Sequence, residues 1–235
     1  MALKTISLLV LSWFIGETTG LAPGLPGTRP RNPGRTLILQ FSNRVGPQNL
    51  RLAETVYTDA FGEPFSVTKC RYYISGITLA GPDGKTFFRT DHCYLVDEAE
   101  AASKTVALSI PAGVIGSVSF FVGVDSTHTE PGTGDLDPLK GMYWAWNHSY
   151  VFARLEGRSD SSHAPTHLLT WDIGGNAALR TITLRSGPSD TLHITADLLA
   201  WFGAIHIARS PVCHQPGPLA TELADNYSRM FSVTP

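Results

Sequence analysis

The sequence has few charged residues and nowhere gathers them into a block. Aspartate, glutamate, lysine and arginine make up 16% of the 235 residues, and the formal net charge is −2. No cluster of lysine and arginine is present, which argues against a nucleic-acid partner and against a basic membrane-binding surface. The chain instead contains 22 glycines and 16 prolines, which favours a turn-rich β protein over a helical bundle.

The common catalytic and nucleotide-binding motifs are also missing. The sequence contains no nucleophile elbow, phosphate-binding loop, dinucleotide fingerprint, His-Glu-x-x-His motif or EF-hand loop. Serine, histidine and aspartate all occur, but nothing in one sequence groups any three of them as a triad. These absences argue against a common hydrolase or nucleotide enzyme, and we expect the protein not to be an enzyme.

Only one apolar run resembles a targeting segment. Lys4 precedes the run Ile6–Ile15, which is too short to span a bilayer, and small and polar residues follow. We therefore expect a signal peptide over residues 1–22 and a periplasmic or secreted mature chain without stable membrane insertion. Residues 23–34 are predicted to form a flexible linker, and residues 35–235 a single domain.

Cysteine is scarce, with only three residues in the whole chain. In an oxidising compartment this odd number permits one disulfide bridge. Cys70 and Cys93 lie on consecutive predicted strands and could pair, although their spacing does not decide the question.

Hydrophobic patterning predicts many short strands and one helix. Apolar residues recur at helical spacing from Leu219 to Phe231, after the prolines that follow Gln215. Such a pattern is typical of an all-β fold, here an antiparallel β-sandwich with a short C-terminal helix. The predicted strands include residues 35–41, 67–79, 105–110, 114–124, 141–155, 167–173, 179–184 and 192–202.

The most aromatic stretch of the chain runs from Gly141 to Tyr150. If this stretch is one strand, alternation places Trp144, Trp146 and His148 on the same face. Two tryptophans and a histidine in one row are unusual for packing alone. We therefore expect the functional site on this face.

Two of the eight histidines stand out by their positions on predicted strands. His148 follows Trp146 by two residues, and His193 lies on the polar face of an otherwise apolar strand. Imidazole nitrogen is a suitable ligand for copper or zinc, so this pair is a candidate metal site. Cys213 and His214, in a proline-rich loop, are an alternative pair of metal ligands that includes a softer, sulfur donor.

An acidic loop precedes the aromatic stretch. It carries Asp125, Glu130, Asp135 and Asp137, whose oxygens could bind calcium. The alternative is a solvated loop shaped by its prolines and glycines. A zinc or calcium site here remains a further possibility.

Seven motifs occur in an order that resembles the MbnP family of secreted copper-binding proteins. The Trp-x-Trp pattern of Gly141–Asn147 is the most specific of them. The motifs are Cys70-Arg-Tyr-Tyr-Ile-Ser75, Phe121-Val-Gly-Val-Asp-Ser126, Leu136-Asp-Pro138, Gly141-Met-Tyr-Trp-Ala-Trp-Asn147, Leu155-Glu-Gly157, Ile173-Gly-Gly175 and Ala224-Asp-Asn-Tyr-Ser-Arg-Met-Phe231.

The resemblance implies a β-rich periplasmic protein whose partner is a di-haem enzyme of the MauG type. That partner oxidises a tryptophan to kynurenine, which binds Cu(I) with a histidine two residues away and a second histidine. Carried onto this chain, the resemblance implies Trp146 as the kynurenine, with Trp144 as the alternative, and His148 as its neighbour. The second histidine is His193, His206 or His167.

The chain departs from the family at several positions. Many members carry histidine at the positions of Asn43 and Asp172, and a small residue at that of His148. Our leading hypothesis is a protein that stores or delivers Cu(I), possessing an oxidised tryptophan and serving a copper uptake system. The competing hypothesis is a metal-free β-sandwich that uses its aromatic surface to bind a partner or to play a structural role.

Overall fold

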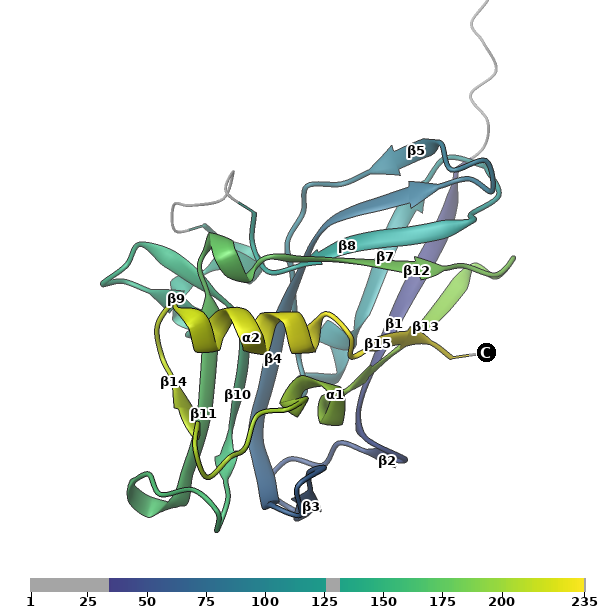
Figure 1. Ribbon diagram of the computed structural model, residues 1–235. Coiled ribbons are helices and arrows are strands. Elements are labelled where there is room, and N and C mark those ends of the chain that lie inside the picture. Colours follow the sequence, from purple (N-terminus) through teal and green to yellow (C-terminus); the bar gives the residue numbers. More distant parts are fainter. Residues whose placement is uncertain (1–33, 126–131, 235) are drawn as a thin grey trace, which may run out of the picture. The chain divides into compact units, whose positions relative to one another are not determined.

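The computed structural model describes residues 34–125 and 132–234, and these form two β-sheets packed face to face (Figure 1). The predicted signal peptide and most of the predicted linker lie outside the described residues. No helix within the described ranges is long and apolar enough to cross a membrane.

The smaller sheet is organised around the first strand. β1 pairs in parallel with β13 and antiparallel with β7 and β2, while β15 extends the sheet beyond β13. The five strands are β1 (Arg35–Val45), β2 (Gln48–Asn49), β7 (Thr105–Ile110), β13 (Thr191–Asp197) and β15 (Phe231–Val233).

The larger sheet is organised around β4, against which three short strands pair in addition to its two long neighbours. Its main strand order is β12-β8-β4-β10-β11-β14, and β11 and β14 run parallel. The strands are β3 (Tyr57–Thr58), β4 (Pro64–Ala80), β5 (Thr86–Arg89), β6 (Tyr94–Asp97), β8 (Ser117–Val122), β9 (Tyr143–Trp144), β10 (Ser149–Arg158), β11 (Leu168–Gly174), β12 (Arg180–Arg185) and β14 (Val212–Cys213).

Aromatic side chains fill the space between the two sheets. Phe41 on β1 packs edge-on against Tyr72 on β4 and Phe120 on β8, with ring centroids 6.3 and 6.1 Å apart. Phe231 on β15 closes the same cluster at 5.6 Å from Tyr72 and 5.4 Å from Phe120. Edge-to-face geometry is the favoured arrangement for such rings, so this cluster joins the sheets.

Two helices cover the part of β11 that faces the interior. Trp171 on β11 packs against Trp201 of α1, and Trp201 packs against Tyr227 of α2. The predicted all-β sandwich with a C-terminal helix is confirmed, with two parallel strand pairs among its antiparallel ones. The helices are α1 (Leu198–Phe202) and α2 (Pro218–Tyr227), and the 3-10 helices are η1 (Ala101–Lys104), η2 (Gly134–Leu136), η3 (Pro138–Lys140), η4 (Pro165–His167) and η5 (Asn176–Ala178).

Three predicted boundaries were wrong. The strand expected over 192–202 ends at Asp197, because its carboxylate accepts a hydrogen bond from the Leu199 amide and caps α1. The C-terminal helix ends at Tyr227, so Phe231 lies on a strand. The strand expected over 141–155 is interrupted by a turn.

The disulfide considered between Cys70 and Cys93 is not formed, since both thiols are free.

Two neighbouring carboxyl groups join the turn between β3 and β4 to the loop after α1. Asp59 accepts hydrogen bonds from the amides of Phe61 and Glu63, and Glu63 accepts from those of Ile207 and Ala208. Burial raises the pKa of Asp59, and contact with the Glu63 carboxyl raises it further. Burial would also raise the pKa of Glu63, but the two amides and the neighbouring Asp59 side chain lower it. We therefore expect Asp59 to keep its proton and Glu63 to be ionised over the same pH range.

We expect the Asp59→Asn variant to be more stable than the natural chain by about 1 kcal/mol once the pH exceeds the raised pKa of Asp59. The natural chain loses this stabilisation as the pH rises through that pKa, whereas an asparagine amide donates to Glu63 at every pH. Stabilisation from Glu63 is present above its unfolded pKa and is lost in both proteins as the pH falls through its lowered folded pKa. Urea unfolding over a pH series measures the difference.

The exposed Asp160→Asn variant is the control for this experiment and should follow the natural chain. Parallel stability curves for the natural chain and Asp59→Asn at all pH values would show that no proton is shared.

Candidate functional site

The aromatic stretch forms a hairpin and not a single strand. β9 pairs with β10 through Trp144 opposite Ser149, and residues 145–148 make the turn between them. The Asn147 amide donates to the Trp144 carbonyl at 3.2 Å, and His148 adopts a left-handed conformation with φ of 46°. The prediction that Trp144, Trp146 and His148 share one strand face was therefore wrong, although all three lie in one hairpin.

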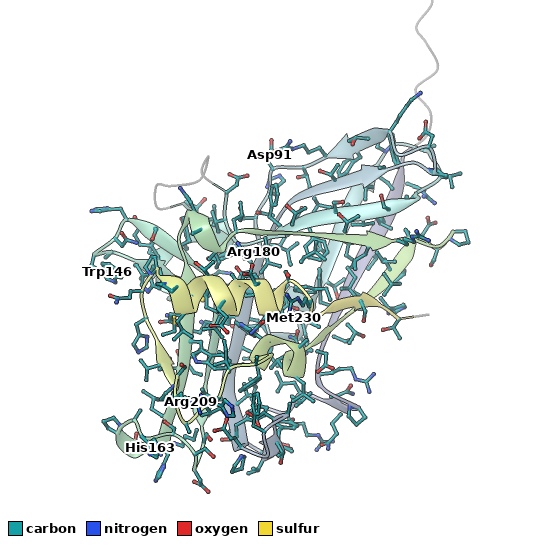
Figure 2. All side chains as sticks on the ribbon, in the orientation of Figure 1. Asp91, Trp146, His163, Arg180, Arg209 and Met230 are labelled. Atoms are coloured by element: carbon teal, nitrogen blue, oxygen red, sulfur yellow. The ribbon has the colours of Figure 1, made fainter. Side chains whose placement is uncertain are left out.

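The two tryptophans of the hairpin meet, but their exposure differs greatly. Their ring centroids are 5.6 Å apart. Trp144 is only 7% exposed, whereas Trp146 is 64% exposed and projects from the edge of the structure in Figure 2. His148, in the turn between the strands, is exposed as well. The hairpin thus presents one indole and one imidazole to solvent above a buried indole.

Gly174, at the end of β11, provides the surface on which Trp144 packs. A Cβ atom at Gly174 would lie 2.5 Å from the Tyr150 carbonyl oxygen and 2.8 Å from a ring carbon of Trp144. A Cβ atom at Gly175 would meet Pro216 at 3.1 Å. The two glycines of the Ile-Gly-Gly motif therefore let the hairpin and the segment before α2 approach the same end of β11.

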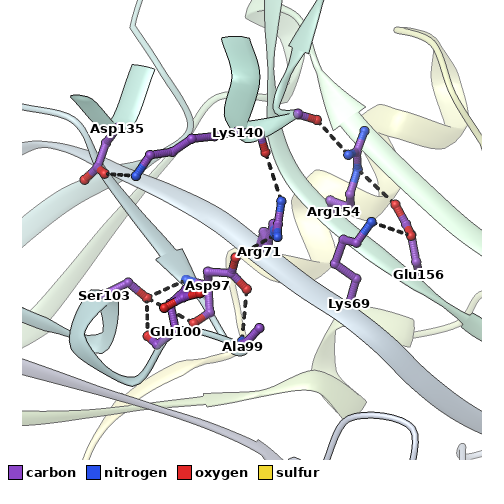
Figure 3. Close-up of polar contacts among 11 residues, drawn as sticks. Lys69, Arg71, Asp97, Ala99, Glu100, Ser103, Asp135, Lys140, Arg154 and Glu156 are labelled. Carbon is purple, nitrogen blue, oxygen red and sulfur yellow. Dashed lines mark hydrogen bonds and ion pairs between the residues drawn. The ribbon is translucent and has the colours of Figure 1, made fainter. Parts of the chain in front are cut away.

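A row of four charged residues crosses the outer face of the larger sheet beneath the hairpin. Strand register places Asp97, Arg71, Arg154 and Asp172 side by side on β6, β4, β10 and β11. Arg71 Nε lies 2.7 Å from Asp97 Oδ2, and Arg154 forms a bidentate pair with Asp172 at 2.5 and 2.9 Å. We call these four residues the charged row; Figure 3 shows three of them.

The two arginines of the charged row also hold the backbone that leads into the hairpin. Arg71 Nη1 donates to the Lys140 carbonyl at 2.9 Å, and Arg154 Nη1 donates to the Gly141 carbonyl at 2.7 Å (Figure 3). The Lys140 ammonium pairs with Asp135 at 2.8 Å. Guanidinium groups suit this role because their planar fork can bind a carboxylate and a carbonyl together.

His214 extends the charged row by one residue. In the parallel pair of β11 and β14, Trp171 is opposite Cys213, and His214 is the first residue after β14. His214 Nδ1 lies 3.5 Å from Asp172 Oδ2, and the His214 side chain is 51% exposed. A cavity of about 380 Å³ is lined by the segment from Val212 to Ala220.

The cysteines are poor candidates for metal ligands. Cys213 is buried, its Sγ lies 3.9 Å from the Gln215 carbonyl, and burial raises the pKa of its thiol. Burial also raises the pKa of the Cys93 thiol to about 12 and that of Cys70 higher still. Because Cys213 is buried and the His214 side chain is 51% exposed, His214 is the more accessible member of the predicted pair.

The other predicted ligands lie away from the hairpin. His193 is exposed on β13 of the smaller sheet, which Figure 1 shows on the opposite side from β9. His167 precedes β11, at the far end of that strand from Gly174, and its Nδ1 lies 3.3 Å from the Ser162 carbonyl. His206 stacks on Phe61 with centroids 3.7 Å apart. The structure therefore does not bring His193, His167 or His206 to the tryptophans.

Nor does the acidic loop form a cation site from its described members. Asp135 accepts a hydrogen bond from the Leu95 amide besides pairing with Lys140, and Asp137 caps η3 by accepting from the Leu139 amide. Glu130 lies outside the described residues. Within residues 34–125 and 132–234, no group of three or more histidine, cysteine, aspartate or glutamate side chains has an arrangement that could hold a metal.

Comparison with known proteins identifies the family. The family model described as MbnP matches residues 34–215, which include the whole charged row and His214. The chain belongs to the MbnP family. A solved structure, MbnP from Methylosinus trichosporium, matches with a TM-score of 0.56 at 16% identity, covering 78% of this chain and 81% of that chain. This likeness shows a common fold. No match was found among curated proteins.

Sequence reasoning did not assign a role to the arginines of this MbnP-family chain. Arg71 and Arg154 each lie within a long, mostly apolar strand. A charged residue in such a strand was the feature of the sequence that could have drawn attention to them. Asp172 was noted only as a departure from the family. Their role depends on the register of four strands, which no spacing in the sequence reveals.

We expect Gly174→Ala to destabilise the protein by about 1–3 kcal/mol, because the added methyl group would displace Trp144 or the Tyr150 carbonyl. Urea unfolding gives the free energy of unfolding, and near-ultraviolet circular dichroism reports the displaced indole. Gly187→Ala is the matched control, since a Cβ atom there meets nothing within 4 Å. Equal stability of the two variants would contradict the packing described for Trp144.

We expect Arg154→Met to lose about 2–4 kcal/mol of stability, because it leaves the nearly buried Asp172 carboxylate without its guanidinium partner. The double variant Arg154→Met/Asp172→Leu should recover much of that loss, since it removes both charges. A double-mutant cycle by urea unfolding measures the coupling. Additive effects would mean that the two side chains do not stabilise one another.

Proposed function

We propose that this MbnP-family protein is exported to the periplasm or secreted, and that it binds Cu(I) to store or deliver it. In this proposal it is a substrate of a MauG-like di-haem enzyme and not itself a catalyst. The observation that carries the proposal is the hairpin, in which an exposed tryptophan and an exposed histidine lie above a second, fixed tryptophan.

Oxidation of a tryptophan would explain how an aromatic hairpin binds a metal. The indole nitrogen is only a donor and has no free lone pair. Kynurenine instead carries an aniline amine and a ketone, both of which have lone pairs. Trp146 is the better candidate for oxidation because 64% of it is exposed. Trp144, which is buried beneath it, is the alternative.

The side chains around the hairpin fit a copper site of low coordination number. His148 offers an imidazole in the same turn as Trp146. The described residues contain no ready-made cluster of three conventional ligands, so a further donor from kynurenine is part of the proposal. Nitrogen donors in an aromatic setting favour Cu(I) over hard cations such as calcium. Copper would be the cargo, and the protein's own residues would hold it and shield it.

A second candidate function is a metal-free binding module. Leu139 is 93% exposed and Trp146 is 64% exposed, and both lie in the segment that the charged row fastens. Exposed large apolar side chains on a fixed segment are suited to contact with another protein.

We expect protein produced together with its di-haem partner to carry kynurenine at Trp146. Peptide mass spectrometry measures the conversion at each tryptophan, and the buried Trp171 and Trp201 serve as internal controls that should stay unmodified. The modified protein should bind Cu(I) more tightly than protein produced without the partner, because only the former has the additional donor.

Variants connect the modification to binding. His148→Ala should weaken Cu(I) binding about 10-fold or more, whereas His193→Ala, on the other sheet, should leave it unchanged. Conversion at no tryptophan of the hairpin, or Cu(I) affinity that is independent of conversion, would favour the metal-free module.

A further inference from the structure

β7 is an edge strand of the smaller sheet, and most of its outer edge is open. It pairs with β1 alone, over six residues and without a bulge. About half of the N–H and C=O groups of such a strand point away from its single neighbour. The Thr105 amide donates to the Ala102 carbonyl. The remaining outward groups have no hydrogen-bond partner within residues 34–125 and 132–234.

Edges elsewhere in the two sheets are short or blocked. On β6, the Leu95 amide donates to Asp135 Oδ2 at 3.1 Å, and the Asp97 amide donates to Ser103 Oγ at 2.9 Å. β12 has an arginine at each end, and one of them binds Asp225 of α2. β14 and β15 are two and three residues long. Short strands, charged residues and covered edges are the usual means by which β proteins prevent pairing between molecules.

β7 has none of these protections. It contains no charged residue and no proline. Its exposed side chains, those of Thr105, Ala107 and Ser109, are small and neutral, and the residues between them are buried. Lys104, which precedes the strand, is paired with Glu98 at 3.0 Å. The strand is therefore regular and uncharged, which is the type of edge that accepts a further strand.

We propose that the outer edge of β7 binds the same edge of a second copy of this chain, antiparallel, so that the two smaller sheets become one continuous sheet. The strand is complementary to itself. When Ala107 lies opposite Ala107 of the second copy, Thr105 lies opposite Ser109, and such hydroxyl pairs stabilise neighbouring strands. A two-fold contact of this kind uses the same surface on both copies and closes at the dimer.

A second copy fits this edge better than an extended peptide from another protein. Peptides that add a strand to a sheet gain specificity from side-chain pockets beside the edge. The cavities of about 450, 430 and 380 Å³ are all lined by other segments of the chain. Charge leads to the same conclusion, because no side chain of β7 would select an acidic or a basic partner. The proposal is independent of the copper function.

Sedimentation velocity of the whole protein as its host produces it, measured without copper over a range of protein concentrations, tests the proposal. The natural chain should form a dimer as its concentration rises. Ala107→Lys should raise the dissociation constant of the dimer about 10-fold or more, because two lysines would meet at the centre of the contact. Thr181→Lys, at an exposed position on β12, is the matched control and should dimerise as the natural chain does. Urea unfolding of both variants verifies that they fold.

Hydrogen exchange on the natural chain locates the contact without any variant. The amides of residues 105–110 should exchange more slowly at high than at low protein concentration, whereas those of β12 should not change. A natural chain that sediments as a monomer at every concentration would contradict the proposal. So would a dimer that Ala107→Lys leaves intact, or one that forms without slowing exchange in β7.

Discussion

The arrangement of the hairpin depends on two arginines placed side by side on neighbouring strands. Arg71 and Arg154 face one another across β4 and β10, a placement that would be unfavourable for like charges alone. An aspartate on each outer side compensates one guanidinium, and two successive backbone carbonyls, of Lys140 and Gly141, each accept one further hydrogen bond. The charged row is therefore joined to the segment before the hairpin by one hydrogen bond from each arginine.

This dependence links the sheet to the surface that carries the tryptophans. The arginines hold the backbone at Lys140 and Gly141, before the hairpin. Gly174 leaves room for the ring of Trp144 within the hairpin. Trp146 then extends beyond a fixed base instead of moving with a free loop. The carboxylate that pairs with Arg154 also lies 3.5 Å from Nδ1 of His214.

Sequence periodicity predicted the fold well where one face of a strand meets the core. The alternation in residues 35–41 and 105–110 follows the buried and exposed positions of β1 and β7 closely. It failed in the hairpin, because the run from Tyr143 to Tyr150 alternates as a strand does and its turn contains neither glycine nor proline. In this turn His148 has a left-handed backbone, a conformation in which histidine is enriched but still uncommon.

The sequence drew attention to only some residues of the candidate site, for a similar reason. The tryptophans and His148 became candidates because they are close in sequence, whereas the charged row joins residues from 71 to 172 through strand register. The predicted partner His193 has the exposed strand position that its alternation suggested, but it belongs to the other sheet. Alternation gives the face of a strand and not the sheet to which the strand belongs.

The parallel pairing of β1 with β13 has a consequence for how the chain acquires its structure. The first strand of the domain finds its central partner only in residues 191–197, and β15, from 231–233, completes that sheet. Contacts between such distant segments form slowly, because a long loop must close before they are made. A chain that emerges from its N-terminus would therefore keep the strand at 35–45 partly unpartnered until almost all of the polypeptide had appeared. Such late closure is compatible with transport across a membrane in an unfolded state.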